Sequence, residues 1–278
     1  MLRNAAAQIV RRPISLVGAV IVLLFLLAAV FGPMVAPYRF DEIIRGAARQ
    51  PPSAEHLFGT DQLGRDIFSR VLWGARDIMV LPLITTTLAV LFGTSLGLFV
   101  GYYGGWIDEV VSRLLDALLS IPALVLALVM LGTIGPSSVG IVAVIVILYT
   151  PIVARVVRAS TLNVRGSGYI ETARLRGESV AYILFREILP SVLPALVVEA
   201  ALRFSYAIFL TASLGFLGLG VQPPSPDWGR MVNEARTAFS QVPWALWFPA
   251  GAIVLLIVGV NLLSDGLRRI FRYEGQLL

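Results

Sequence analysis

The amino-acid sequence predicts an all-α membrane protein with six transmembrane helices and both termini on the cytoplasmic side. Of the 278 residues, 57% are hydrophobic and only 14% are charged, whereas soluble domains carry about 25% charged residues. Six apolar runs are long enough to cross a bilayer, which needs about 20 residues. Between them lie polar segments, and the short cytoplasmic ones are rich in arginine, as the positive-inside rule predicts.

The composition also excludes several classes of function. All 22 basic residues are arginine, so a lysine-dependent nucleotide-binding loop is absent. With no cysteine and one histidine, His56, the chain has no Cys/His metal cluster and no Cys–His nucleophile. The net charge of +5 fits arginines retained on the cytoplasmic side better than a nucleic-acid partner. We therefore expect neither catalysis nor a metal or cofactor in this chain.

The first expected span, residues 14–37, follows a cytoplasmic segment at residues 1–13. Arg11 and Arg12 precede the apolar run and favour a cytoplasmic N-terminus. The run is too long for a cleaved signal peptide, so we expect a retained signal anchor. Residues 38–77 then form an external loop with six arginines and six acidic residues, and its end is expected to be helical.

The next three spans are expected at residues 78–103, 114–132 and 138–158. Gly93, Gly97 and Gly101 recur every four residues in the second span, a spacing suited to close helix packing in lipid. Residues 104–113 are expected to be a short cytoplasmic turn. Pro122 predicts a kink in the third span.

A cytoplasmic loop at residues 159–190 is predicted to hold two short helices. Ser167 is a candidate N-cap for the first helix, and Gly177 can adopt the left-handed conformation that ends it. The second helix is expected to run from about residue 179 until Pro190 interrupts the chain. Both helices carry apolar side chains that could dock against a partner: Tyr169, Ile170, Ala173, Val180, Ile183 and Leu184.

The fifth and sixth spans are expected at about residues 191–220 and 246–270. A second external loop, residues 221–245, lies between them and contains Trp228, which suits a membrane interface. Residues 271–278 form a cytoplasmic tail. The membrane domain therefore covers residues 14–270.

The cytoplasmic loop resembles the EAA loop of ABC-importer permeases. The residues that match are Glu171, Ala173, Gly177, Leu189 and Pro190. Thr172 replaces the middle alanine, and Glu187 stands where the family has an apolar residue. The resemblance implies that this loop is a coupling helix seated in a separate ATPase subunit. The alternative is an amphipathic connector on the membrane surface. The residues expected to couple are Glu171, Thr172, Ala173, Arg174, Gly177 and Glu178.

Residues 56–70, H-L-F-G-T-D-Q-L-G-R-D-I-F-S-R, resemble a signature of the C-type permease subunits of dipeptide, oligopeptide and nickel importers. Residues 213–236 and 261–269 resemble the same group, whereas the ending R-Y-E-G-Q-L-L is atypical of it. The resemblance implies an external cap that contacts the partner permease or the binding protein through Asp61, Gly64, Arg65, Asp66 and Trp228. The alternatives are interfacial anchoring for Trp228 and, for the first loop, a self-contained salt-bridge network of Asp61, Arg65, Asp66 and Arg70.

This resemblance implies a type I ABC importer permease fold in the bacterial cytoplasmic (inner) membrane, in contact with lipid. It also implies three kinds of partner: a second, B-type permease subunit, one or two ABC ATPase subunits that bind ATP and Mg, and an extracytoplasmic substrate-binding protein. Di- or oligopeptides are the expected substrates, with nickel, glutathione or haem as alternatives.

Glu199 and Arg203 lie four residues apart in the fifth span and therefore on one helix face. They form either a mutually neutralised pair or a site that lines the translocation path or contacts the second permease. A gradient-driven secondary transporter is the competing functional class. It would need unneutralised membrane carboxylates or broken helices in two matching repeats.

Overall fold

The structure, a computed structural model, describes residues 13–274, and these residues form helices and no β-strand. Residues 1–12 of the predicted segment 1–13 and residues 275–278 of the predicted segment 271–278 lie outside them. Four helices and one continuous helical stretch are long and apolar enough to cross a membrane, and a bent helix pair supplies a sixth span, as the sequence predicts. The spans are α2 (Pro13–Val35), α3 (Ile67–Tyr103), α4 (Gly105–Leu119) with α5 (Ala123–Ile134), α6 (Ser138–Val164), α9 (Leu189–Phe216) and α11 (Trp244–Glu274).

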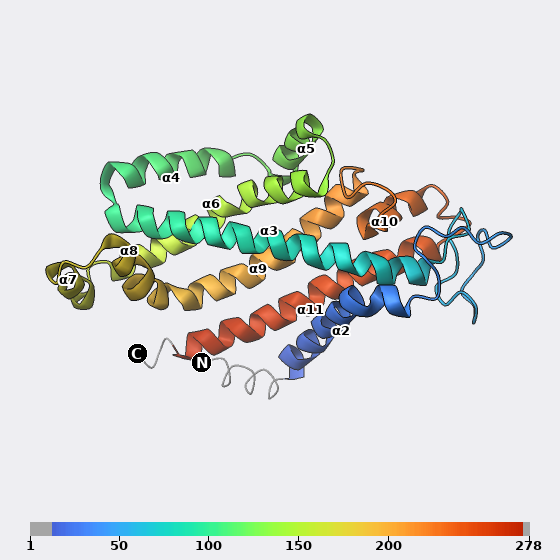
Figure 1. The fold of residues 1–278 in the computed structure, drawn as a ribbon, viewed down its shortest axis with the longest axis horizontal. Coiled ribbons are helices and arrows are strands. Elements are labelled where there is room, and N and C mark those ends of the chain that lie inside the picture. The colour runs from blue at the N-terminus through green and yellow to red at the C-terminus, as the bar shows by residue number, and fades with distance from the viewer. Residues whose placement is uncertain (1–12, 275–278) are drawn as a thin grey trace.

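The short helices gather at opposite ends of this bundle (Figure 1). At one end lie α7 (Gly168–Leu175) and α8 (Val180–Tyr182), both from the predicted cytoplasmic loop. At the other end, the loop between α2 and α3 lies beside α10 (Trp228–Arg236), which forms within the second predicted external loop. The two predicted external loops thus share one end, and the predicted coupling loop occupies the other.

The glycine stripe of α3 packs against α6, as its four-residue spacing predicts. A Cβ atom on Gly97 would lie 2.5 Å from the carbonyl oxygen of Ala154. On Gly93 it would lie 2.6 Å from the Cβ atom of Val153. Backbone contact this close is available only to glycine, so these two helices form the tightly packed centre of the bundle.

The expectation of a turn over residues 104–113 is wrong, because the turn consists of only two residues. Gly104 and Gly105 have φ angles of 64° and 60°, and α4 begins at once. Asp108 then lies in the first turn of α4, where a negative charge suits the helix dipole. The span expected at residues 114–132 is not a kinked helix but two helices bent by 84° at a break that includes Pro122.

The sequence predicts that the second loop helix ends at Pro190, but in the structure it continues. Ser179 caps α8, which continues through a π-helical segment, η1 (Ile183–Ile188), directly into α9. Within the wider segment the backbone N–H of Leu189 donates to the carbonyl of Leu184, five residues back. A proline ring clashes with the carbonyl four residues before it, and a π-bulge relieves such a clash without ending the helix. The span also ends earlier than predicted, at Phe216.

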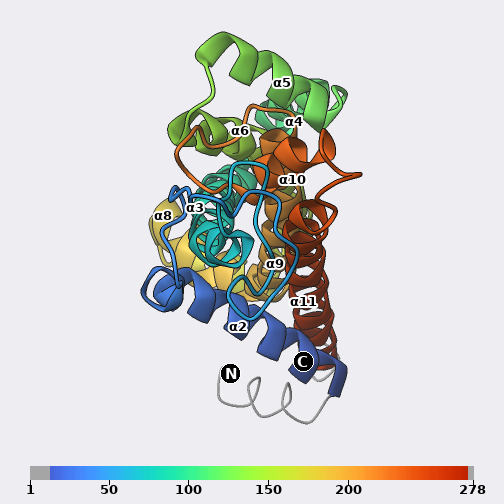
Figure 2. The ribbon, with the colours of Figure 1, turned by 90° about the vertical axis from the view of Figure 1, so that its right-hand side faces the viewer.

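Helix α2 crosses the outside of the bundle and touches it closely at two points. Near its start, a Cβ atom on Gly18 would lie 2.7 Å from the carbonyl oxygen of Gly259 on α11. Near its end, a Cβ atom on Gly32 would lie 2.6 Å from the carbonyl oxygen of Leu72 on α3. Figure 2 shows α2 passing across α3 and towards α11 at the edge of the molecule. Between these two contacts Phe25 of α2 packs against the core of the bundle.

Candidate coupling surface and the polar cap at the opposite end

Helix α7 is attached to the bundle by the apolar side chains that the sequence offered as a docking patch. Ile170 and Ala173 are fully buried, and they pack in one cluster with Leu98 of α3 and Val157 of α6. Ile183 and Leu184 of η1 are buried in the same cluster. The docking patch expected from these four residues is therefore wrong, because they hold the loop in place.

The outward side of α7 carries a different apolar group, Leu175. This side chain is 89% exposed, and Tyr169 and Val180 nearby are exposed as well. Burying a leucine of this kind stabilises a complex by about 1.5–3 kcal/mol. Sequence reasoning missed Leu175 because the apolar spacing alone does not show which side of a short helix faces the bundle.

The charged residues of the loop differ in how firmly they are held. The Nε of Arg174 donates to the hydroxyl of Tyr102 at 3.2 Å, and its guanidinium lies 4.7 Å from the centre of that ring. Arg176 pairs with Glu178 at 3.6 Å. Among the described residues, the exposed side chain of Glu171 has no ion pair or hydrogen bond. Glu171 is thus free to meet a partner.

The turn after α7 depends on Gly177, as the sequence predicts. Its φ angle is 73°, and the backbone N–H of Glu178 closes the helix on the carbonyl of Ala173 at 3.2 Å. A Cβ atom on Gly177 would meet nothing within 4 Å. The position therefore needs glycine for its backbone conformation, and the space around it is open. Thr172 is exposed and bonds within α7, to the carbonyl of Gly168.

We call the candidate coupling surface the exposed residues of α7 and the turn that follows it. It consists of Tyr169, Glu171, Thr172, Arg174, Leu175, Arg176, Gly177 and Val180, together with the half-buried Glu178. It combines a projecting leucine with an unpaired carboxylate on a helix whose opposite side is anchored. Such an arrangement can transmit force between a partner and the bundle.

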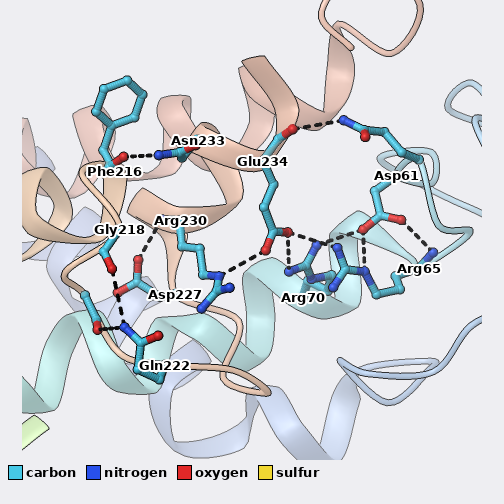
Figure 3. A network of polar contacts seen from close by, with 12 residues as sticks. Asp61, Arg65, Arg70, Phe216, Gly218, Gln222, Asp227, Arg230, Asn233 and Glu234 are labelled. Atoms are coloured by element: carbon cyan, nitrogen blue, oxygen red, sulfur yellow. Dashed lines mark hydrogen bonds and ion pairs between the residues drawn. The ribbon is translucent and has the colours of Figure 1, made fainter. Parts of the chain in front are cut away.

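At the opposite end, ion pairs join the first loop to α10, and we name this group the polar cap: Asp61, Arg65, Arg70 and Glu234 (Figure 3). Asp61 accepts from Arg65 at 2.6 Å and from Arg70 at 2.8 Å. Glu234 contacts the same two arginines at 2.9 and 3.3 Å. Burial raises the pKa of Glu234, but the positive charges of Arg70 and Arg65 lower it by more. The pKa of this carboxyl group therefore lies below its ordinary value.

Asp66 and Gly64, which were predicted to contact a partner from this loop, stabilise the loop itself. Asp66 caps α3 by accepting from the backbone N–H of Ser69 at 2.8 Å, and its other oxygen lies 3.0 Å from His56. Asp66 was expected to belong to the salt-bridge network with the arginines, and this expectation is wrong. Gly64 has a φ angle of 82°, and its carbonyl accepts from the backbone N–H of Ile44 at 3.1 Å. Both residues shape the loop.

The structure corrects the expectation for Trp228. The side chain is 1% exposed, and its indole N–H donates to the carbonyl of Val71 at 3.0 Å. The ring also packs edge-on against Phe25. Trp228 therefore anchors α10 to the core and offers no surface to a binding protein or to the membrane interface.

Glu199 and Arg203 lie together on α9, as their spacing predicts. The carboxylate and guanidinium are 2.8 Å apart without the alignment of a hydrogen bond, and both side chains are mostly buried. The guanidinium also faces the rings of Tyr149 and Tyr206 at 5.5 and 4.8 Å. The positive charge is thus shared between a carboxylate and two aromatic faces. Within residues 13–274 no group of three or more side chains could hold a metal ion.

Comparison with known proteins places this arrangement in a family. The family model for the inner-membrane component of binding-protein-dependent transport systems matches residues 93–272. The model for the N-terminal transmembrane domain of oligopeptide transport permease C matches residues 1–52. The chain belongs to the binding-protein-dependent transport permeases. It is therefore a multi-pass inner-membrane protein and a permease of an ABC importer.

Relatives extend over almost the whole permease. The chain is 40% identical to a dipeptide transport system permease protein of Alkalihalophilus pseudofirmus, over 96% of this chain and 88% of the relative. It is 38% identical to a glutathione transport system permease protein of Pectobacterium atrosepticum, over 94% and 87%. A probable D,D-dipeptide transport system permease protein of Escherichia coli is 40% identical, over 92% and 86%.

A solved structure supports the fold of this permease. The MetNI methionine ABC transporter, in inward-facing conformations, has a chain that aligns with a TM-score of 0.59 at 19% identity. The alignment covers 73% of this chain and 95% of that one. The helical bundle is therefore that of an ABC importer permease.

Proposed function

We propose that the chain is the C-type permease subunit of an ATP-driven importer that moves di- or oligopeptides across the cytoplasmic membrane. Two of the relatives described above are named for dipeptides, and a third for glutathione, which is itself a peptide. Glutathione is accordingly the second candidate substrate. The partners in this proposal are a B-type permease, one or two ATPase subunits that bind ATP and Mg, and a substrate-binding protein.

The α7 end is cytoplasmic in this proposal, and both chain termini lie on the same side. The candidate coupling surface then meets an ATPase subunit. Leu175 fills an apolar recess of that subunit, and Glu171 pairs with one of its polar or basic groups. The exposure of Leu175 on an anchored helix is the observation that supports this role most strongly. ATP binding and hydrolysis occur in the partner subunits.

The mechanism in this proposal is alternating access between two arrangements of the paired permeases. Closure of the ATPase pair moves α7, and the buried cluster beneath Ile170 and Ala173 passes the movement to α3, α6 and η1. The ligand bound elsewhere changes only the relative stability of the two arrangements. The polar cap lies at the end where a loaded binding protein would dock.

A gradient-driven transporter is less well supported by the side chains. Such a mechanism requires a membrane carboxylate that can gain and lose an ion or proton. Glu199 is held 2.8 Å from Arg203, which neutralises it. The competing class therefore lacks its most plausible residue on α9.

The test is ATPase activity of the complete importer in lipid nanodiscs, with and without binding protein. We expect Leu175→Ala to reduce the stimulation by binding protein at least about tenfold, because a buried leucine contact is lost. Glu171→Ala should reduce it as well. Leu24→Ala is the matched control, since Leu24 is 60% exposed on α2, far from α7 in the fold.

Loss of the ATPase subunits from the Leu175→Ala complex during purification would also support the contact. Stimulation equal to wild type in both Leu175→Ala and Glu171→Ala, in an assembled complex, would show that the surface does not couple. Transport by the chain alone, with an ion gradient and no ATPase subunit, would replace the importer proposal altogether.

A further inference from the structure

A groove lies between α2 and the bundle, in the stretch that α2 spans between its two close contacts. Its volume is about 510 Å³. Leu26 and Val30 of α2 form one wall, Met79 and Leu83 of α3 form the other, and Phe204 of α9 also lines it. The lining is apolar apart from one side chain, Arg76. The groove therefore has the amphipathic character of a site for a molecule with one charged end.

Arg76 has no compensating charge within the described part of the chain. It is exposed, and it takes part in none of the ion pairs or side-chain hydrogen bonds there. Adjacent residues on a helix point in different directions, so the neighbouring Asp77 does not pair with Arg76. Asp77 instead accepts a hydrogen bond from Ser225. An arginine beside an apolar groove attracts an anion such as phosphate, because its planar guanidinium can donate to two of the phosphate oxygens at once.

The depth of Arg76 along α3 corresponds to the lipid headgroups. Trp73 lies near one end of the helix and Tyr102 near the other, 29 residues later, which corresponds to about 44 Å of helix. A bilayer with its headgroup regions measures about 40–45 Å, and such aromatic residues mark its interfaces. Arg76 lies about one helical turn inward of Trp73, so we infer that it lies near the boundary between headgroups and hydrocarbon.

We propose that this groove binds an anionic phospholipid. The guanidinium of Arg76 holds the phosphate, and an acyl chain lies beneath α2 against Val30, Leu83 and Phe204. The charge of the arginine selects a lipid over an apolar segment of another protein. The lipid lies along the side of α2, next to the contact that Phe25 makes with the core, and covers part of a helix whose surface is largely exposed.

The test is titration of the purified importer complex with phosphatidylglycerol, followed by native mass spectrometry. We expect Arg76→Gln to weaken phosphatidylglycerol binding about fivefold, the effect of one arginine near an anionic lipid surface. Arg76→Lys should retain binding. Arg45→Gln is the matched control, because Arg45 is an exposed loop arginine outside the groove.

A second variant tests the apolar part independently of the charge. Val30→Trp fills the groove and should displace the lipid while Arg76 stays in place. Phosphatidylglycerol binding by Arg76→Gln equal to that of Arg45→Gln would overturn the proposal, as would unchanged binding by Val30→Trp. A photo-crosslinker at residue 83 should capture lipid, and capture of another protein subunit instead would assign the groove to that subunit.

Discussion

Asp227 illustrates how the location of one carboxyl group changes its chemistry. It caps α10 by accepting from the backbone N–H of Arg230 at 2.7 Å, yet it is almost completely buried between α9 and α10. Burial raises its pKa from the ordinary value of 3.8 to about 6, and nearby Asp77 adds to this effect. The folded protein therefore retains a proton that the unfolded chain releases between these two pH values.

We expect this proton to make stability depend on pH. Between about pH 4 and pH 6 the folded state binds more protons, so the free energy of unfolding falls as the pH rises, by on the order of 3 kcal/mol. Asp227→Asn keeps a capping side chain without the charge. It should abolish this slope and raise the unfolding temperature at pH 7, measured by tryptophan fluorescence in detergent.

Asp41→Asn serves as the control, because Asp41 is exposed and pairs with an exposed arginine. It should leave the pH dependence of unfolding as it is in the wild type. A slope that persists in Asp227→Asn would mean that another group carries the proton.

At the residue scale, local spacing predicts local contacts and little else. The four-residue interval in the sequence predicts the pair Glu199–Arg203, and this pair is formed. Asp61 and Arg65, two members of the expected salt-bridge network, also pair. Glu234 could not be predicted as a member of the polar cap, because it lies 164 residues from Arg70. The expectation that Trp228 lies at a surface was wrong for a similar reason. Tryptophan is found both at interfaces and in cores, and only the neighbouring residues decide between the two.

At the scale of the elements, α3 and α6 tolerate little change where their backbones meet. We expect Gly97→Leu to prevent correct packing, because the new side chain meets the backbone of Ala154, which cannot move aside as a side chain can. The cost should exceed the roughly 1–3 kcal/mol of ordinary overpacking. The measurement is the yield of monodisperse permease and its unfolding temperature.

Gly132→Leu is a matched control within a helix, since a Cβ atom at Gly132 of α5 meets nothing within 4 Å. It should fold with a yield near that of the wild type. A stable, monodisperse Gly97→Leu protein would show that α3 and α6 can separate at no great cost.

The sequence predicts the existence of these elements better than their ends. Apolar runs identify all six spans, because a membrane segment must be long and apolar whatever it packs against. The ends of helices depend on single residues. Two consecutive glycines shortened the turn before α4, and the widened segment η1 allowed a helix to pass through Pro190.

On the scale of the whole molecule, the polar cap ties the loop before α3 to α10. We expect Glu234→Gln to weaken this tie by about 1–2 kcal/mol, between the values for exposed and fully buried ion pairs, because its side chain is 35% exposed. Limited proteolysis should then cleave the loop at residues 38–66 more readily than in the wild type.

Glu109→Gln provides the comparison. Its pair with Arg113 is exposed on both sides, so its loss should change neither stability nor cleavage. Equal protection of the loop in Glu234→Gln and wild type would show that the ion pairs of Glu234 do not hold it.

The unbroken helix from α8 through η1 to α9 makes a lever of this part of the protein. It contains 37 residues, from Val180 to Phe216, and is therefore about 55 Å long. One end joins the turn after α7, and the other packs against α10. Over that length, each degree of tilt about the α8 end moves the α10 end by about 1 Å. In the proposed mechanism, a displacement of the α8 end would thus reach the α10 end through the helix itself, alongside the buried cluster beneath α7.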